Sequence, residues 1–228
     1  MKPKSIAIIP DGNRRFAAKN RLAVRNAYSK GFEKVEQLLG WTEGTGIEEV
    51  GFWALSLENY SKRSTVELRA LFSLISRYLD KAAREKTFQN KGISVKFFGK
   101  LALLPDALQE KMRALEEATA GGDRTLRVGV AYSGKEEILQ AAKRFAVDFT
   151  GKDAGKATES DFEKYLYVQT APDLIIRTGN VSRLSGFLPW QNAYSELYFC
   201  KKLWPEFEEK DFKAAIEFYE NTERRFGQ

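Results

Sequence analysis

Short apolar runs alternate along the chain with longer segments in which apolar residues recur every three or four positions. The apolar runs predict strands at 5–9, 50–54, 93–98, 126–131, 174–176 and 197–199. The longer pattern predicts helices at 28–41, 65–88, 106–118, 134–149, 160–167 and 208–224. This alternation is typical of a mainly parallel sheet with helices on both faces. We therefore expect an α/β protein with a single domain over residues 1–228 and a central sheet of about six strands.

The segment 65–88 carries the longest helical pattern. Its apolar stripe is made of Leu68, Leu71, Phe72, Ile75, Leu79 and Ala82. A stripe of this kind is most often plain core packing. Two predicted helix starts carry a capping box, a serine followed three positions later by a glutamate, and these are Ser133 with Glu136 and Ser160 with Glu163.

Composition narrows the chemistry that the chain can perform. Lys and Arg number 37 against 31 acidic residues, which gives a net charge of +6 and favours anionic partners. The absence of histidine excludes Ser-His-Asp triads, Cys-His pairs and His-ligated zinc sites. Cys200 is the one cysteine, so no disulfide can form within the chain and a reducing, cytoplasmic location is expected. No apolar run approaches the roughly 20 residues of a membrane span.

Polar residues follow two of the predicted strands at the points where the strands end. Asp11-Gly12-Asn13-Arg14-Arg15 follows the first strand, and Arg177-Thr178-Gly179-Asn180 with Arg183 and Ser185 follows the fifth. Lys62-Arg63 adds a third basic loop. Ligands of open α/β sheets bind outside the carboxyl ends of the strands, and guanidinium groups suit phosphate. Asp11 becomes useful beside an anion when Mg²⁺ lies between them.

Each of these features has an ordinary explanation when it is taken alone. An Asp-Gly-Asn sequence is most often a turn, and paired arginines are usually solvated surface charge. The conjunction of three basic loops with one acid at strand ends, in a chain without histidine, is what favours a phosphate-binding function.

Several sequence blocks, in the same order, resemble those of the cis-prenyltransferase family, the undecaprenyl diphosphate synthase group. The opening block is IIPDGNRRFA at 8–17, and SLENY follows at 56–60. The later blocks are DLIIRTG at 173–179, RLSGFLPWQ at 183–191, YSEL at 194–197, LWPEF at 203–207 and RRFG at 224–227. The resemblance therefore covers nearly the full length of the chain.

The resemblance implies an enzyme that condenses an allylic prenyl diphosphate with isopentenyl diphosphate, forms a cis double bond and releases pyrophosphate. Mg²⁺ is the implied cofactor, and Asp11 matches the catalytic aspartate that carries it. Glu196 matches a second acid near the metal, which often reaches the site across a dimer interface, so a homodimer is expected. Gly227 matches a tail that can close over the phosphates of the partner subunit.

The resemblance also assigns the substrate sites. Asn59 is the second candidate catalytic residue, and the resemblance implies that it lies with Ser56 beside the reacting carbons. The allylic diphosphate is expected at Gly12 to Arg15, and isopentenyl diphosphate at Arg177, Arg183 and Ser185. The full set of expected substrate-binding residues is Gly12, Asn13, Arg14, Arg15, Phe16, Tyr28, Ser56, Tyr60, Arg63, Arg177, Arg183 and Ser185.

The growing hydrocarbon needs an apolar tunnel, covered by the long helix that begins near residue 65. A bulky side chain that blocks the tunnel would set the product length. The candidate wall consists of Leu55, Leu57, Leu68, Phe72, Ile75, Phe97 and Phe98. Peripheral contact with a membrane surface is expected for release of the product.

The chain departs from the family pattern at several positions. Tyr28 stands where many members have histidine, and Val181-Ser182 stands where many have Glu-His. Phe16 and Tyr60 replace frequent tryptophans. One extra residue after Asn59 lets either Lys62 or Arg63 fill the arginine position of the family, and we favour Arg63. These departures leave room for an atypical acceptor or an atypical regiochemistry of coupling.

Three rival functions follow from the same residues. A non-catalytic partner subunit of a heteromeric prenyltransferase would typically lack Asp11 and the arginine clusters, which are present here. A phosphatase with Asp11 as nucleophile would want an aspartate at position 13, where the chain has asparagine. A nucleic-acid-binding module agrees with the charge, but no stacking pattern of aromatic and basic residues supports it, so no nucleic acid is expected as a partner.

Overall fold

Six parallel strands form one sheet at the centre of the protein. The structure is a computed structural model that describes residues 1–150 and 154–223. The strand order is β3-β4-β2-β1-β5-β6, and every neighbouring pair runs parallel. The strands are β1 Ser5–Ile9, β2 Glu49–Ser56, β3 Ile93–Phe98, β4 Arg124–Tyr132, β5 Leu174–Arg177 and β6 Glu196–Phe199. The prediction of a mainly parallel six-stranded sheet is confirmed.

The position of β1 between β2 and β5 determines where a ligand can bind. The chain passes from β1 to one side of the sheet and returns to the other side only at β5. Such a reversal of winding direction opens a crevice outside the carboxyl ends of the strands. The register pairs Ile9 with Arg177, so the last residues of β1 and β5 lie at the same level of the sheet.

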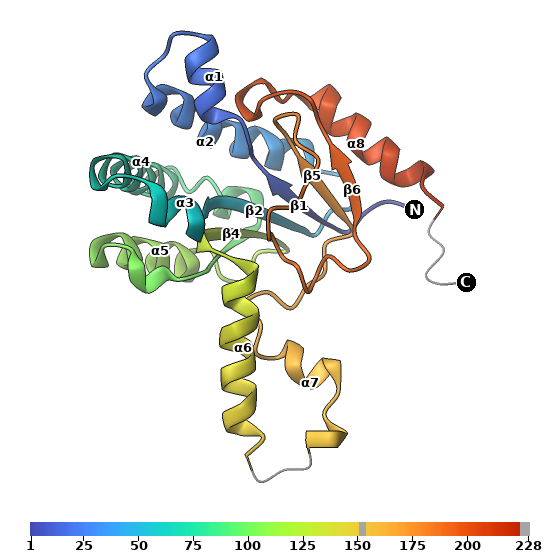
Figure 1. Ribbon diagram of the computed structural model, residues 1–228. Helices are drawn as coiled ribbons and strands as arrows, with labels where there is room; N and C mark the ends of the chain where they lie inside the picture. Colours follow the sequence, from blue (N-terminus) through green and yellow to red (C-terminus); the bar gives the residue numbers. More distant parts are fainter. Residues whose placement is uncertain (151–153, 224–228) are drawn as a thin grey trace.

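Eight α-helices lie within the described residues, together with four short 3₁₀ turns. The α-helices are α1 Asn13–Lys19, α2 Val24–Trp41, α3 Leu57–Lys62, α4 Thr65–Arg84, α5 Asp106–Ala118, α6 Gly134–Asp148, α7 Glu159–Glu163 and α8 Glu209–Asn221. The 3₁₀ turns are Gln89–Lys91, Leu101–Leu103, Ala154–Lys156 and Trp204–Glu206. Figure 1 shows α6 running away from the sheet with α7 beside it, while α3, α4 and α5 lie together on another side of the molecule.

Four helices pack against one face of the sheet to form the main hydrophobic core. Buried residues of α2, α4, α5 and α8 pack with Ile6, Ile8 and other strand residues of one sheet face. A smaller cluster on the opposite face joins Ala7, Ile9 and Trp53 to segments around Val168 and Phe187-Leu188. The larger of the two clusters therefore lies on the face that α2, α4, α5 and α8 cover.

Several predicted boundaries are reproduced and others shift for local reasons. The predicted bounds of β1, β3 and α5 match the structure at both ends. The long helix α4 ends at Arg84, four residues early, and Lys86 adopts a left-handed conformation with φ of 50° just beyond it. The helix predicted for 208–224 is described as Glu209–Asn221, and residue 224 lies outside the described residues.

Both predicted capping boxes are wrong. Ser133 is the N-cap residue of α6, but its side chain makes no capping bond. The reason is that the carboxylate of Glu136 turns instead to the Tyr167 hydroxyl, which donates to it at 3.1 Å. The box of α7 is formed by Thr158 with Asp161, two residues before the predicted pair. Where several hydroxyl and acidic residues lie close together in sequence, more than one capping box can form. The packing of the folded chain determines which of them does.

Candidate active site

A cleft of about 820 Å³ opens at the carboxyl edge of the sheet. Residues that follow β1, β2, β4 and β5 all reach it, which is the edge where the sequence places the ligand. Among the predicted site residues, those that line it are Asp11, Gly12, Asn13, Arg14, Arg15, Tyr28, Ser56, Asn59, Arg63, Arg177, Arg183 and Ser185.

Asp11 lies between two arginines at the centre of this cleft. Its Oδ1 accepts a hydrogen bond from Arg15 Nη2 at 3.0 Å, and its Oδ2 accepts one from Arg177 Nη2 at 2.9 Å. The Arg177 side chain is only 6% exposed, whereas that of Asp11 is 32% exposed. The guanidinium of Arg177 is therefore fixed by its surroundings, while the carboxylate faces the cleft.

The backbone around Asp11 is held by two neighbouring segments. The carbonyl oxygen of Asp11 accepts hydrogen bonds from Trp204 N at 3.0 Å and from Thr178 Oγ1 at 2.9 Å. Gly12 follows with φ of 119°, and a Cβ at this position would lie 2.9 Å from the Cα of Leu203. Only glycine accommodates both the left-handed conformation and this close approach. The turn after β1 therefore depends on the segment that contains Leu203 and Trp204.

Asn13 begins α1 and points toward the buried side of the cleft. Its amide Nδ2 donates to the Pro10 carbonyl at 3.4 Å. Its Oδ1 is buried and has no hydrogen-bond partner among the described residues. A buried amide oxygen without a partner is unfavourable, and a bound water molecule would satisfy it.

The second arginine cluster forms around the loop after β5. Arg177 Nη1 donates to Ser185 Oγ at 2.8 Å and also to the Arg183 carbonyl oxygen. Arg183 Nε donates to the same Ser185 Oγ at 3.2 Å. Arg15 Nη1 donates to the Gly179 carbonyl at 2.6 Å and so ties the first loop to the second. The two clusters are thus parts of one network around Asp11.

A third group of residues lies where β2 leads into α3 and α4. Ser56 caps α3, and its Oγ accepts the backbone N–H of Asn59 at 3.0 Å. Arg63 Nη2 donates to the Tyr28 hydroxyl at 2.8 Å, and its guanidinium carbon lies 5.4 Å from the centre of the Tyr28 ring. Burial raises the pKa of Tyr28, so its hydroxyl stays protonated at neutral pH.

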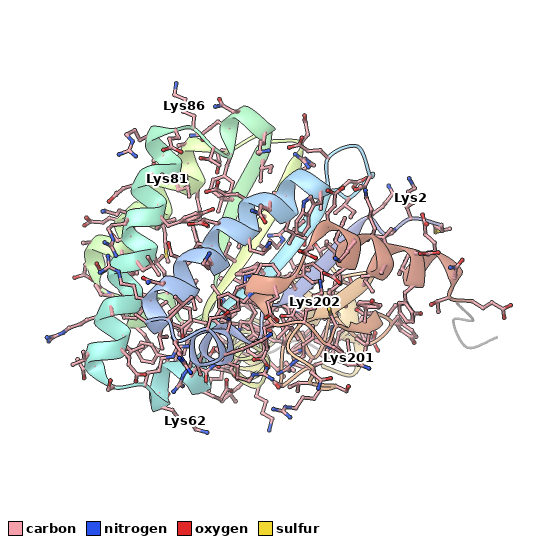
Figure 2. The ribbon with its side chains drawn as sticks, turned by 90° about the horizontal axis from the view of Figure 1, so that it is seen from above. Lys2, Lys62, Lys81, Lys86, Lys201 and Lys202 are labelled. Atoms are coloured by element: carbon pink, nitrogen blue, oxygen red, sulfur yellow. The ribbon has the colours of Figure 1, made fainter. Side chains whose placement is uncertain are left out.

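Lys62 and Arg63 differ in how the structure holds their side chains. Both residues border the cleft. Arg63 is half-buried and bonded to Tyr28, whereas Lys62 is exposed and points outward from the molecule in Figure 2. This geometry favours Arg63 as the residue held in place for a ligand, as the sequence interpretation does.

Three predicted site residues do not line the cleft. Phe16 is half-buried on α1, and the Tyr60 hydroxyl donates to the Leu103 carbonyl at 3.1 Å. Glu196 begins β6 and pairs in register with Leu174, whereas Arg177 pairs with Phe199. At a rise of ~3.3 Å per residue, Glu196 lies roughly 10 Å along the sheet from the level of Arg177. Within one chain it is therefore not beside Asp11, and its role across an interface stays a prediction.

Sequence analysis missed several residues of the cleft. Ser133 and Lys135 follow β4, and Glu58, Gly186 and Trp204 complete parts of the wall. At 132–135 the end of a strand is followed by a small polar residue, a glycine and a lysine. This is the same kind of pattern that identified Asp11 to Arg15. Lys135 could therefore have been found, whereas Trp204 depends on a contact with a distant turn.

The residues present fit a magnesium ion only in combination with a ligand. Among the described residues there is no group of three or more acidic, histidine or cysteine side chains that could hold a metal. Mg²⁺ is commonly bound by one or two carboxylates together with phosphate oxygens and water. Asp11 is one such carboxylate, and it lies where arginines would bring phosphate oxygens.

A small apolar cavity adjoins the cleft on its inner side. It measures about 40 Å³, and Phe32, Phe52 and Ala54 line both spaces. Of the seven predicted tunnel residues, Ile75 and Phe97 line the apolar cavity and Leu55 lines the cleft. Phe98 belongs to the cluster on the opposite sheet face, because neighbouring strand residues point to opposite faces. Leu57, Leu68 and Phe72 line neither space.

Comparison with known proteins identifies the family. A sequence model of the family described as "Putative undecaprenyl diphosphate synthase" matches residues 9–227. The chain belongs to this family.

Two relatives illustrate that the similarity extends over nearly the whole chain. One is the tritrans,polycis-undecaprenyl-diphosphate synthase (geranylgeranyl-diphosphate specific) of Thermoplasma volcanium, 41% identical over 99% of this chain and 89% of the relative. Another is the isoprenyl transferase of Thermotoga maritima, 39% identical over 99% of this chain and 97% of the relative. Since the match runs through all the site blocks, the family assignment covers the cleft as well as the sheet.

Solved structures of the family have the same fold. Lavandulyl diphosphate synthase from Lavandula x intermedia, in complex with dimethylallyl diphosphate, gives a TM-score of 0.94 at 29% identity and covers 100% of this chain and 99% of that one. A probable undecaprenyl diphosphate synthase from Campylobacter jejuni gives a TM-score of 0.83 at 30% identity over the full length of both chains.

None of the helices in the described residues is both long and apolar enough to pass through a membrane.

Proposed function

We propose that the chain joins isopentenyl diphosphate to an allylic prenyl diphosphate, releases pyrophosphate and forms a cis double bond. Prenyl chain condensation is the activity of the family to which the chain belongs. The observation that carries the proposal is the position of Asp11 between Arg15 and Arg177 in a cleft that leads to an apolar cavity. A prenyl diphosphate has a charged diphosphate at one end and an apolar hydrocarbon tail at the other, which matches a charged cleft followed by an apolar cavity.

Each of the two arginine clusters would bind one of the two diphosphates. Arg177, Arg183 and Ser185 form one cluster that would hold isopentenyl diphosphate. Gly12 to Arg15 would hold the allylic diphosphate on the other side of Asp11. Arginine binds phosphate oxygens through paired, charge-assisted hydrogen bonds, and the buried Arg177 presents its guanidinium in a fixed orientation.

Magnesium would be held by Asp11 together with diphosphate oxygens. When bound, the ion would offset the negative charge that develops on the leaving diphosphate. Arg15 and Arg177 would contribute to the same stabilisation, and Ser56 would keep Asn59 in place near the reacting carbons. Hydrogen-bond donors and charges that are already in place are usually the largest contribution to a reaction of this kind.

The apolar side of the cleft would take the hydrocarbon of the allylic substrate. Phe32, Phe52 and Ala54 lie where the two spaces meet, so a tail that enters between them leaves the charged cleft for an apolar cavity. Exclusion of water protects a short-lived allylic cation from hydrolysis. Burial of each CH₂-sized group contributes about 0.8 kcal/mol to binding.

We further propose that two copies of the chain form the active enzyme. The support is Glu196, whose position in the family is that of a second acid near the metal, and which lies far from Asp11 within its own chain. A partner subunit could bring its copy of Glu196 to the cleft. The exposed apolar residues Leu139 and Val147 on α6, and Tyr194 before β6, offer surface for such a contact.

The names of the relatives leave the primer open. The Thermoplasma relative is named for geranylgeranyl diphosphate, and the Lavandula structure contains dimethylallyl diphosphate. The experiment that tests the proposal is incubation of the protein with labelled isopentenyl diphosphate, Mg²⁺ and a panel of allylic primers. Product mass and double-bond geometry also distinguish regular cis coupling from an atypical regiochemistry, and the absence of any product would contradict the proposal.

A further inference from the structure

The first turn of α6 forms one wall of the cleft. β4 ends at Tyr132, and Ser133 and Lys135, which follow it, both line the cleft. Ser133 is the N-cap residue of this 15-residue helix, but its side chain makes no capping bond. It is only 7% exposed, and its hydroxyl has no hydrogen-bond partner among the described residues. A buried polar group without a partner is unfavourable, so this hydroxyl can donate to an acceptor in the cleft.

The backbone of the same turn can also donate to an anion. The N–H groups of the first residues of a helix have no acceptor within the helix. That of Gly134 donates to the Gly186 carbonyl at 3.0 Å, which leaves those of Lys135 and Glu136. The positive end of the helix dipole adds to the attraction for negative charge.

The two acidic side chains of this turn are directed away from the cleft. Glu136 accepts a hydrogen bond from the Tyr167 hydroxyl at 3.1 Å and lies 3.6 Å from the ammonium group of Lys100. Glu137 is fully buried, and its carboxylate accepts from the Tyr132 hydroxyl at 2.6 Å and from the backbone N–H of Tyr167 at 2.7 Å. The charge that the turn presents to the cleft is therefore positive.

The contact between Gly134 and Gly186 also places this turn beside one of the two arginine clusters. Gly186 follows Ser185, which accepts hydrogen bonds from Arg177 and Arg183. A Cβ on Gly134 would lie 2.6 Å from the Gly186 carbonyl oxygen, so glycine is what allows this approach. β2 separates β4 from β1, so the loop that would hold the allylic diphosphate is two strand spacings, roughly 10 Å, away along the sheet edge.

We propose that Ser133, Lys135 and the first turn of α6 form a further anion subsite, which binds the diphosphate of isopentenyl diphosphate together with Arg183 and Ser185. This inference rests on the proposed condensation. Lys135 is exposed and forms no ion pair with a described residue, so its ammonium group is free to reach a phosphate oxygen. The Ser133 hydroxyl and the free backbone N–H groups would donate to the same diphosphate.

The test compares KM for the two substrates in five proteins. Wild type, Lys135→Ala, Lys135→Arg, Ser133→Ala and Lys143→Ala are assayed with Mg²⁺, labelled isopentenyl diphosphate and an allylic primer. For Lys135→Ala, KM for isopentenyl diphosphate is expected to rise at least about fivefold while KM for the primer changes little, since one charge-assisted contact to one substrate is lost. Lys135→Arg keeps the charge and should recover most of this loss. Ser133→Ala should act in the same direction by a smaller factor.

Lys143→Ala is the matched control, because Lys143 is an exposed lysine of the same helix that does not line the cleft. It is expected to give wild-type values of KM for both substrates. A Lys135→Ala protein with unchanged KM for isopentenyl diphosphate, or with equal rises for both substrates, overturns the inference while the proposed function stands. A wild type that forms no condensation product overturns the proposed function and this inference with it.

Discussion

Asp11 and Arg177 are 166 positions apart in the chain, and their side chains form an ion pair at 2.9 Å. The pair exists because β1 and β5 are adjacent and in register, with Ile9 opposite Arg177. Arg177 is nearly buried and is also bonded to Ser185, so its guanidinium cannot follow a ligand that is displaced from this point. The position of the carboxylate and the orientation of this guanidinium are consequently fixed by the same contact.

Replacement of Asp11 should abolish turnover with little loss of fold. For Asp11→Ala we expect a fall in kcat of at least about 10²-fold, since removal of one preorganised charge interaction typically has this effect. The carboxylate is partly exposed, so the free energy of unfolding should fall by only about 1–2 kcal/mol. Steady-state kinetics and urea unfolding measure the two effects, and near-normal turnover of a folded variant would contradict the role of Asp11.

Replacement of Arg183 should affect one substrate more than the other. Arg183→Ala removes a guanidinium that contacts Ser185 in the second cluster. A charge-assisted hydrogen bond contributes about 1.5–3 kcal/mol, so KM for isopentenyl diphosphate should rise at least about tenfold while KM for the primer changes little. Arg21→Ala, an exposed position that does not line the cleft, is the control. Equal effects on both substrates would refute the division of the two sites.

Gly12 should be essential for the turn after β1. An alanine there would combine a φ of 119° with a contact of 2.9 Å to Leu203. Strain and overpacking each cost about 1–3 kcal/mol, so Gly12→Ala should lower the free energy of unfolding by about 2–6 kcal/mol.

Gly46→Ala supplies the control for this measurement. Gly46 has φ of 89°, but nothing lies within 4 Å of a Cβ built there. The difference between the two variants isolates the contact with Leu203, and equal losses of stability in chemical denaturation would show that this contact is unimportant.

Glu196 offers a test of the proposed dimer. If the partner's Glu196 completes the site, Asp11→Ala and Glu196→Ala should each be inactive alone. Mixed under conditions that exchange subunits, they should recover activity, because one site of the mixed dimer has both residues intact. About a quarter of the wild-type activity is the expected upper level for random exchange. Failure to recover activity in a confirmed mixed dimer would exclude this role.

Local patterns in the sequence predicted the sheet and most of the cleft, while the packing between helices could not be predicted. Asp11, Arg177 and Ser185 follow strands, and parallel strands place such residues at one edge. The sequence-based tunnel wall includes both Phe97 and Phe98, although the alternation of strand side chains allows only one of them to face it. The stack of Phe32 on Tyr78 depends on how α2 lies against α4, which no local pattern determines.

Incorporation of labelled isopentenyl diphosphate into an allylic primer tests the central claim most directly. The reaction is followed for wild type and for Asp11→Ala, with Mg²⁺ and with excess chelator. We predict a cis-configured prenyl diphosphate from wild type with Mg²⁺ and background incorporation in the other three reactions. Equal incorporation by wild type with chelator, or by Asp11→Ala with Mg²⁺, would contradict the account of a magnesium-dependent condensation centred on Asp11.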